Sequence, residues 1–280
     1  GLLNGLNYIH TNSPFTRIFP DEELDAVGFV TKIHNDKIYF GTNKGLYVGD
    51  WKNQYSPLKS INFQLVQNTK GQIWGLDIVD DDLIVSHANG AMKVKNGIAQ
   101  SFFNKTGIWN FKRLNNYPEL RVSGGYFNIS LFRKENESYQ LLPDFTQLNE
   151  SSRFVEEDQK GNIWMSHPYR GVFKISPNST FTNSKVELLG KEQGLPSSLL
   201  NHLFKINNEI IFCGEQGAFT YNYEAKRFDE YPIFNDIFGK KNKIRRLFET
   251  PNKNIWFVTQ DEFGILKIDD KGLEKKINKI

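Results

Sequence analysis

The sequence predicts an all-β fold built from about six repeated four-stranded units, and three observations support this prediction. First, a short strand, a turn closed by glycine and a second short strand recur six times along the 280 residues. Second, apolar residues alternate or run in fours and fives, whereas amphipathic helices repeat them every three or four positions. Third, the chain contains 23 Phe and 11 Tyr, which favour strands, and 22 Gly, which favour turns.

The clearest repeated unit is the hairpin that runs from Gly161 to Ser176. Its first strand contains Trp164, a polar turn ends at Gly171, and a second apolar strand follows. The six hairpins cover residues 37–48, 83–94, 120–132, 161–176, 210–221 and 255–268. Their turns close at Gly45, Gly90, Asn128, Gly171, Gly217 and Gly264, where Asn128 is expected to adopt the left-handed backbone that glycine adopts elsewhere.

The spacing of the closing positions, 38 to 47 residues, is typical of the blades of a β-propeller. An apolar segment precedes each hairpin and is expected to form the innermost strand of its blade: 29–33, 74–79, 109–114, 153–155, 201–206 and 244–248. Fourth strands are expected at 63–67, 139–142, 185–189 and 227–231, and one short helix at 196–203. We interpret residues 1–280 as a single propeller domain. An alternating apolar patch in residues 1–19 (Leu6, Tyr8, Ile18) could add a strand to a neighbouring blade.

Composition excludes several classes of function. The 35 basic and 32 acidic residues are interspersed, so no nucleic-acid binding is predicted. The single cysteine, Cys213, lies in an apolar run and can form neither an internal disulfide nor a thiolate zinc cluster. No apolar run is long enough to span a membrane. Catalytic motifs are absent and Glu156 and Glu157 face opposite sides of a strand, so we predict no enzyme activity, no metal and no cofactor.

Two sets of residues are candidates for ligand binding, because propellers bind ligands near the axis of one face. The first set lies at the start of the innermost strands and would suit a polyhydroxylated or anionic ligand: Trp74, Trp109, Arg153, His202 and Arg245. The alternative is that the tryptophans pack between blades and the arginines bind main-chain carbonyls.

The second set lies in the turns between the second and third strands and contains His87, Tyr169 and Arg170. Of these turns, the one with Tyr169 and Arg170 carries the richest chemistry. His87 and His167 occupy equivalent positions, but alternate blades keep them apart, so hydrogen bonding is favoured over a metal pair. Asp80, Asp81 and Asp82 are interpreted as a solvated turn, because their spacing does not match a calcium loop.

The units D-Q-K-G-N-I-W-M-S-H-P-Y-R-G-V-F-K-I (158–175) and P-N-K-N-I-W-F-V-T-Q-D-E-F-G-I-L-K-I (251–268) resemble the two-component regulator propeller repeat. The resemblance covers essentially the whole chain and is weakest in the third unit. It implies the extracytoplasmic sensor of a membrane-spanning regulator of Bacteroidetes-type bacteria, followed by a triple-tyrosine β-sandwich and a histidine kinase or helix-turn-helix output. It also implies that these residues are one piece of a longer protein.

From the resemblance we expect a periplasmic sensor module, with an oligosaccharide or related nutrient as its ligand and a homodimer in the parent protein. Two alternatives stay open. One is a scaffold for dimerisation or protein interaction without a small ligand. The other is a propeller lyase or glycoside hydrolase, which would need a pair of carboxylates at the axis.

Overall fold

The computed structural model describes residues 26–51, 62–269 and 272–279, and within them the chain forms six four-stranded antiparallel sheets. The first sheet contains β1 (Gly28–His34), β2 (Lys37–Thr42), β3 (Leu46–Asp50) and β4 (Gln64–Leu65). The second contains β5 (Ile73–Val79), β6 (Asp82–His87), β7 (Gly90–Lys95) and β8 (Ile98–Phe103). The third contains β9 (Ile108–Arg113), β10 (Leu120–Gly125), β11 (Ile129–Glu135) and β12 (Ser138–Leu142).

The other three sheets repeat this order. The fourth contains β13 (Phe154–Glu157), β14 (Ile163–His167), β15 (Gly171–Ser176) and β16 (Lys185–Leu189). The fifth contains β17 (His202–Ile206), β18 (Glu209–Gly214), β19 (Gly217–Asn222) and β20 (Arg227–Glu230). The sixth contains β21 (Arg246–Glu249), β22 (Ile255–Val258), β23 (Glu262–Asp269) and β24 (Gly272–Lys279). The predicted all-β propeller of six four-stranded blades is confirmed.

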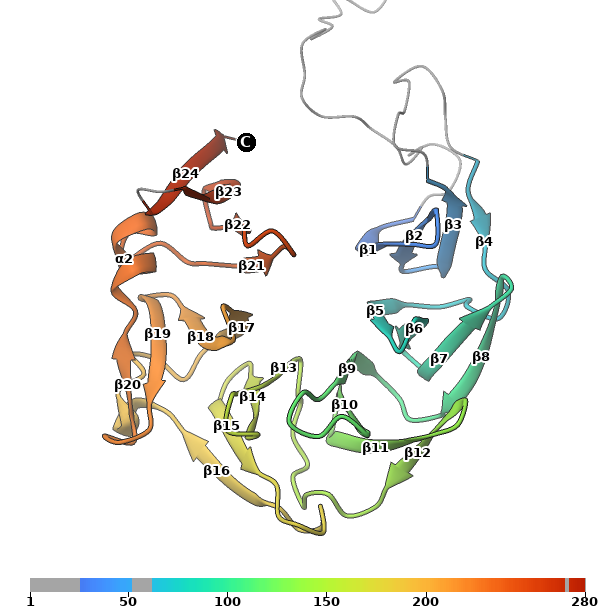
Figure 1. Cartoon of the computed structure of the whole chain (residues 1–280), viewed down its shortest axis with the longest axis horizontal. Helices are drawn as coiled ribbons and strands as arrows, with labels where there is room; N and C mark the ends of the chain where they lie inside the picture. The colour runs from blue at the N-terminus through green and yellow to red at the C-terminus, as the bar shows by residue number, and fades with distance from the viewer. Residues whose placement is uncertain (1–25, 52–61, 270–271, 280) are drawn as a thin grey trace, which may run out of the picture.

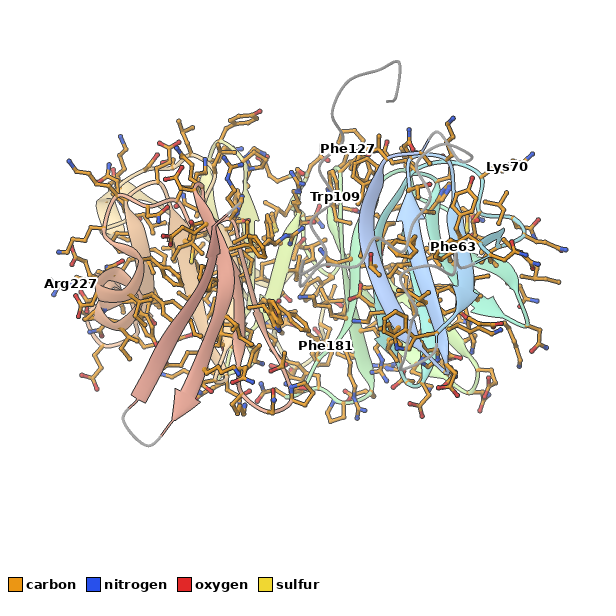
Figure 2. All side chains as sticks on the ribbon, turned by 90° about the horizontal axis from the view of Figure 1, so that it is seen from above. Phe63, Lys70, Trp109, Phe127, Phe181 and Arg227 are labelled. Atoms are coloured by element: carbon orange, nitrogen blue, oxygen red, sulfur yellow. The ribbon has the colours of Figure 1, made fainter. Side chains whose placement is uncertain are left out.

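The six sheets stand around a common axis, with the first strand of each sheet innermost and the fourth outermost (Figure 1). The ring is open between the first and sixth sheets (Figure 1). The turns between second and third strands lie on one face of the disc, which we call the upper face. Figure 2 shows Phe127, from such a turn, on this face, and Phe181, from a connection between third and fourth strands, on the opposite face.

Five apolar cores hold the ring together, one between each pair of consecutive sheets. Between the third and fourth sheets, for example, Val122 and Leu131 pack with Ile163 and Met165. The opposite face of the fourth sheet packs against the fifth through Trp164, which contacts Phe212. Each sheet is therefore apolar on both faces, and burial of both faces depends on a neighbour on each side.

The two faces that flank the opening have no such neighbour in the described part of the chain. Ile33 of β1 is exposed on the first sheet, and Phe248 and Trp256 are exposed on the sixth. Phe248 and Trp256 are cross-strand partners, so their side chains lie on the same face of the sixth sheet. These end faces have the apolar composition of the faces that are buried elsewhere in the ring.

Buried polar side chains also link consecutive sheets. Asp80, in the turn after β5, binds the guanidinium of Arg121 in the third sheet. Asp158, in the turn after β13, accepts a hydrogen bond from Trp164 Nε1 at 2.6 Å and one from the hydroxyl of Tyr223, in the turn after β19 of the fifth sheet. The aspartates of these turns thus fix the relative positions of neighbouring blades.

Most predicted strands are confirmed, but two turns differ from their predictions. Asn128 does close the third hairpin, since its carbonyl accepts the Gly125 N–H, but its φ is not positive. The sixth turn closes at Glu262, whose carbonyl accepts the Thr259 N–H, while Gly264 lies within β23 opposite Phe257. The predicted closing position of the sixth turn, Gly264, therefore lies two residues after the observed one, Glu262.

The predicted helix at 196–203 is wrong. This segment is a loop followed by the start of β17, because Leu200 has a φ of 50° and the Ser197 side chain and carbonyl bond to Leu199 and Asn201. Within the described residues an α-helix lies instead at α2 (Pro232–Phe238), which begins with proline, and a 3₁₀ turn covers Lys191–Gln193. Strands β8 and β24 were not predicted, and the apolar patch of residues 1–19 lies outside the described residues.

Candidate functional site

A pocket of about 330 Å³ opens on the axis of the ring, between the innermost strands of the first four sheets and the sixth. Its aromatic lining comes from Phe29, Trp74, Trp109 and Phe154, and its charged lining from Asp77, Lys112, Arg153, Glu156 and Arg246. Figure 2 shows Trp109 near the upper face, close to Phe127. The pocket exists because the innermost strands turn alternate side chains toward the axis, where no main chain fills the space.

The aromatic rings form a continuous row along one side of this pocket. The ring centroids of Phe29 and Trp74 are 5.5 Å apart, those of Trp74 and Trp109 are 4.6 Å apart, and Tyr126 lies 4.9 Å from Trp109. Both indole N–H groups are buried and make no hydrogen bond within the described residues. The tryptophans therefore offer the pocket their apolar ring surfaces rather than their N–H groups, which suits stacking.

Two arginines reach the pocket from different blades. The Arg153 guanidinium lies 5.2 Å from the Trp109 ring centroid and 6.0 Å from that of Phe154, and the Arg246 guanidinium lies 5.5 Å from the Phe154 centroid. In the described part of the chain neither guanidinium forms an ion pair or a hydrogen bond. Burial lowers the pKa of Arg246, and the positive charge of Arg153 lowers it further.

Two carboxylates lie in the same pocket, and each accepts a hydrogen bond from another group of the protein. Glu156 accepts a hydrogen bond from Lys112, and Asp77 accepts one from the Phe111 N–H at 3.1 Å. Burial raises the pKa of Asp77, although Lys112 and the Phe111 N–H oppose the shift. Burial alone would lower the pKa of Lys112, but Glu156 and Asp77 outweigh it and raise that pKa.

His202 of the fifth sheet lies beside the pocket rather than in its lining. Its imidazole stacks on the Phe154 ring with centroids 4.6 Å apart, and its Nδ1 donates to the Arg245 carbonyl at 3.2 Å. Burial lowers its pKa to about 4, which the Arg245 carbonyl opposes and the charges of Arg246 and Arg153 reinforce. The imidazole is therefore neutral at neutral pH and packs against the Phe154 ring.

Of the predicted axial set, Trp74, Trp109 and Arg153 line one pocket and His202 packs against it. Arg245 does not line the pocket, and its neighbour Arg246 does. The difference follows from strand geometry, since consecutive residues point to opposite sides. In this region the Arg245 N–H bonds to the Val258 carbonyl, and Arg246 pairs with Val258 in the strand register.

The predicted turn residues lie away from this pocket. Tyr169 is 71% exposed, and Arg170 pairs with Glu150, which also lies 3.2 Å from His167 Nε2. His87 is buried: its Nε2 lies 3.2 Å from the Lys70 carbonyl, and its Nδ1 accepts the Asn89 N–H. The structure therefore does not bring these three residues together with the axial set, and ligand binding by them stays a prediction.

Sequence reasoning missed Phe29, Phe154, Asp77, Lys112, Glu156 and Arg246. A signal was present for two of them. Asp77 and Lys112 are charged residues inside apolar segments that were expected to form innermost strands. A charge at such a position is costly unless it faces a polar cavity or a partner, so it marks a strand residue that points to the axis.

Other kinds of site are not found in the described residues. No group of three or more His, Cys, Asp or Glu side chains is arranged to hold a metal ion there. Within the same ranges, no helix combines the length and apolar character needed to cross a membrane. Cys213 is buried, and burial raises the pKa of its thiol.

Comparison with known proteins gives matches only at the level of structure: no family model and no curated protein sequence matches this chain. Two structures of the extracellular domain of BT4673 from B. thetaiotaomicron, described as a one-component system and as a hybrid two-component system, are similar, both with a TM-score of 0.62 and 15% identity. The matches cover 90% and 93% of this chain and 33% and 34% of the extracellular-domain chains, so this chain spans about a third of their length.

Propellers of other functions are also similar. Virginiamycin B lyase from Staphylococcus aureus has a TM-score of 0.59 at 12% identity, with 91% of this chain and 85% of the lyase covered. The WD40 domain of Pan2 from Neurospora crassa has a TM-score of 0.62 at 11% identity, with 94% and 82% covered. At such identities the likeness shows the fold. The BT4673 structures belong to the class of protein that the sequence units at 158–175 and 251–268 resemble.

Proposed function

We propose that this chain is the periplasmic ligand-sensing module of a membrane-bound regulator, and that its ligand is an oligosaccharide bound in the axial pocket. One observation carries the proposal: a row of aromatic rings and two arginines that have no acidic partner in the described residues line the same pocket. Aromatic faces stack on the apolar faces of sugar rings, and polar side chains at the rim provide hydrogen bonds to hydroxyls. The likeness to BT4673 supports the assignment to a regulator.

The mechanism we propose is a population shift in a homodimer of the parent protein. A ligand bound at the axis contacts the innermost strands of several blades at once. It therefore favours the arrangement of blades in which it makes all of these contacts. A ligand changes an equilibrium only by as much as its affinity differs between the two states. The size of the regulator's response would therefore depend on how much more tightly the ligand binds one arrangement than the other.

Calorimetric titration of this chain with a panel of oligosaccharides tests the proposal. We expect saturable binding, weakened roughly tenfold by Trp109→Ala because one stacking surface is lost. Trp256→Ala is a matched control, since Trp256 is a tryptophan of the sixth sheet outside the pocket. No binding by a folded chain, or equal loss in both variants, would contradict an axial sugar site and favour a scaffold.

A second candidate is cleavage of a bound glycoside, and the presence of Asp77 and Glu156 in one pocket favours it. A general acid needs a raised pKa, which burial gives Asp77, and a second carboxylate is the usual partner. Incubation of the chain with the oligosaccharides that it binds, followed by chromatography, tests for products. Products that disappear in Asp77→Asn would establish an enzyme, and unchanged ligand would exclude this activity for those sugars.

A further inference from the structure

In the described residues, Arg153 and Arg246 line one pocket and neither has an acidic partner, unlike three arginines elsewhere in the ring. Arg121 binds Asp80, Arg170 binds Glu150 and Arg227 binds Asp229. Within the described residues, the guanidiniums of Arg153 and Arg246 form no ion pair or hydrogen bond, and both lie within 6.0 Å of the centroid of Phe154. Two like charges around one ring are unfavourable unless a counter-charge joins them.

The acidic side chains of the pocket do not supply that counter-charge. Glu156 is bound by Lys112 and Asp77 by the Phe111 N–H. The pocket lining therefore contains three cations, Lys112, Arg153 and Arg246, against two carboxylates, and one of these, Asp77, has its pKa raised by burial. The lowered pKa of Arg246, caused by burial and by Arg153, is consistent with an excess of positive charge.

We propose that the axial pocket binds an acidic saccharide, one that carries an oxyanion in the form of a uronic acid carboxylate or a sulfate ester. This inference rests on the proposed function and names the chemical class of its ligand. A guanidinium presents parallel N–H donors that match the two oxygens of a carboxylate or sulfate, and it does so best where water is partly excluded. An anion between Arg153 and Arg246 would also relieve their mutual repulsion.

The geometry joins anion recognition to ring stacking. Arg153 lies over the Trp109 ring at 5.2 Å, and Trp74 continues the aromatic row at 4.6 Å from Trp109. An oxyanion held by Arg153 therefore brings the sugar ring that bears it against the aromatic row. A neutral sugar could stack on the same surface, but it would leave both guanidiniums without a partner.

The test uses pairs of ligands with the same sugar backbone, in which one member carries the negative charge and the other lacks it. Oligouronates, such as oligogalacturonate and oligomannuronate, are titrated against their methyl esters, and sulfated disaccharides against their desulfated forms. We expect one acidic member to bind and its neutral counterpart to bind at least tenfold more weakly. Binding of the acidic member should also weaken as salt rises from low to physiological concentration, because salt screens the charges.

Variants then locate the interaction. Arg153→Gln and Arg246→Gln should each weaken binding of the acidic ligand on the order of tenfold to a hundredfold, because a charge-assisted hydrogen bond is lost. They should leave binding of the neutral counterpart nearly unchanged. Arg227→Gln is the matched control, because Arg227 lies on the outermost strand β20, far from Trp109 in Figure 2, and pairs with Asp229. Thermal unfolding checks that each variant folds.

The outcomes separate this inference from the proposed function. Equal binding of acidic and neutral members, unaffected by either arginine variant but weakened by Trp109→Ala, would overturn the inference and leave an axial sugar site. Binding of acidic ligands that falls equally in Arg227→Gln would overturn it as well, since it would reflect general charge. Absence of binding by every member of the panel to a folded chain would overturn both.

Discussion

Trp164 and Trp256 occupy the same position in their blades, yet one is fully buried and the other is 47% exposed. In the strand register Trp164 stands opposite Glu156 and Trp256 opposite Phe248, at equivalent points of the first and second strands. Trp164 is covered by the fifth sheet, where Phe212, Tyr221 and Phe228 surround it. Trp256 lies on β22 of the sixth sheet, which borders the opening of the ring (Figure 1).

This pair predicts very different costs for the same substitution. Trp164→Ala should lower the free energy of unfolding by about 3–5 kcal/mol, because it leaves a cavity between two blades. Trp256→Ala should cost about 1 kcal/mol or less, because nearly half of its side chain is already in water. Urea unfolding followed by circular dichroism compares the midpoints of the two variants. Similar midpoints would mean that the sixth sheet is covered in solution.

Asp158 is the acceptor of a hydrogen-bonded cluster that links the fourth and fifth blades. It is buried and accepts hydrogen bonds from the Lys160 and Asn162 N–H groups, Trp164 Nε1 and the Tyr223 hydroxyl. Asp158→Asn places an amide N–H₂ against these donors, so we expect a loss of about 1–3 kcal/mol in unfolding free energy. Tyr223→Phe, which removes a single donor, should cost less. An unchanged midpoint for Asp158→Asn would show that this cluster does not contribute to stability.

The Asp80–Arg121 pair predicts both a mutational cost and a pH dependence. Arg121 is 2% exposed, so Asp80→Ala leaves a buried, unpaired charge and should cost about 3–5 kcal/mol. Replacing both residues, Asp80→Ala with Arg121→Met, should recover part of that loss. The measurement is the urea midpoint of each variant, and equal losses in the single and double variants would contradict the pairing.

The pH dependence follows from the direction of the Asp80 shift. Burial would raise the pKa of Asp80, but its bonds to Arg121 and the charges of Arg121 and Lys134 outweigh this and lower it. The unfolded chain then binds the proton first as pH falls, so the stabilising effect is complete above the ordinary aspartate pKa and is lost in more acidic solution. The difference in stability between the wild-type chain and Asp80→Ala should shrink in that acidic range.

The repeat could be predicted from the sequence because each blade carries its own local signals. Alternating apolar residues and turn residues such as Asn35 and Asp36, which adopt positive φ, are properties of a few neighbouring residues. The fourth strands were harder, since β4 is two residues long and the apolar residues of β8 stand in pairs on either side of Gln100 and Ser101 instead of alternating. The helix at Pro232 was missed because seven residues show too little periodicity.

The candidate site could be predicted only in part, because it depends on which side of a strand each residue faces. Trp74, Trp109 and Arg153 were found because propeller geometry places the start of each innermost strand at the axis. Arg246 was missed in favour of Arg245 because a shift of one residue reverses the direction of every side chain. The pairing of Lys112 with Glu156 joins residues 44 positions apart, and local pattern does not predict such a contact.

The environment of His202 disfavours its protonated imidazole, which predicts that the stability of the protein depends on pH. Burial lowers its pKa from 6.5 to about 4, so the folded chain keeps it neutral where an unfolded chain would bind a proton. The unfolded state therefore binds more protons between those values, and stability should fall as pH decreases from about 6.5 toward about 4. His202→Phe keeps the stacking on Phe154 but removes the titrating group, so its stability should decrease less over this range.

The measurement is the thermal midpoint of both proteins as a function of pH, together with the imidazole NMR signals, in which the signal lost in the variant should titrate near pH 4. Parallel pH curves for the two proteins would show that His202 is protonated as readily in the folded protein as in the unfolded chain.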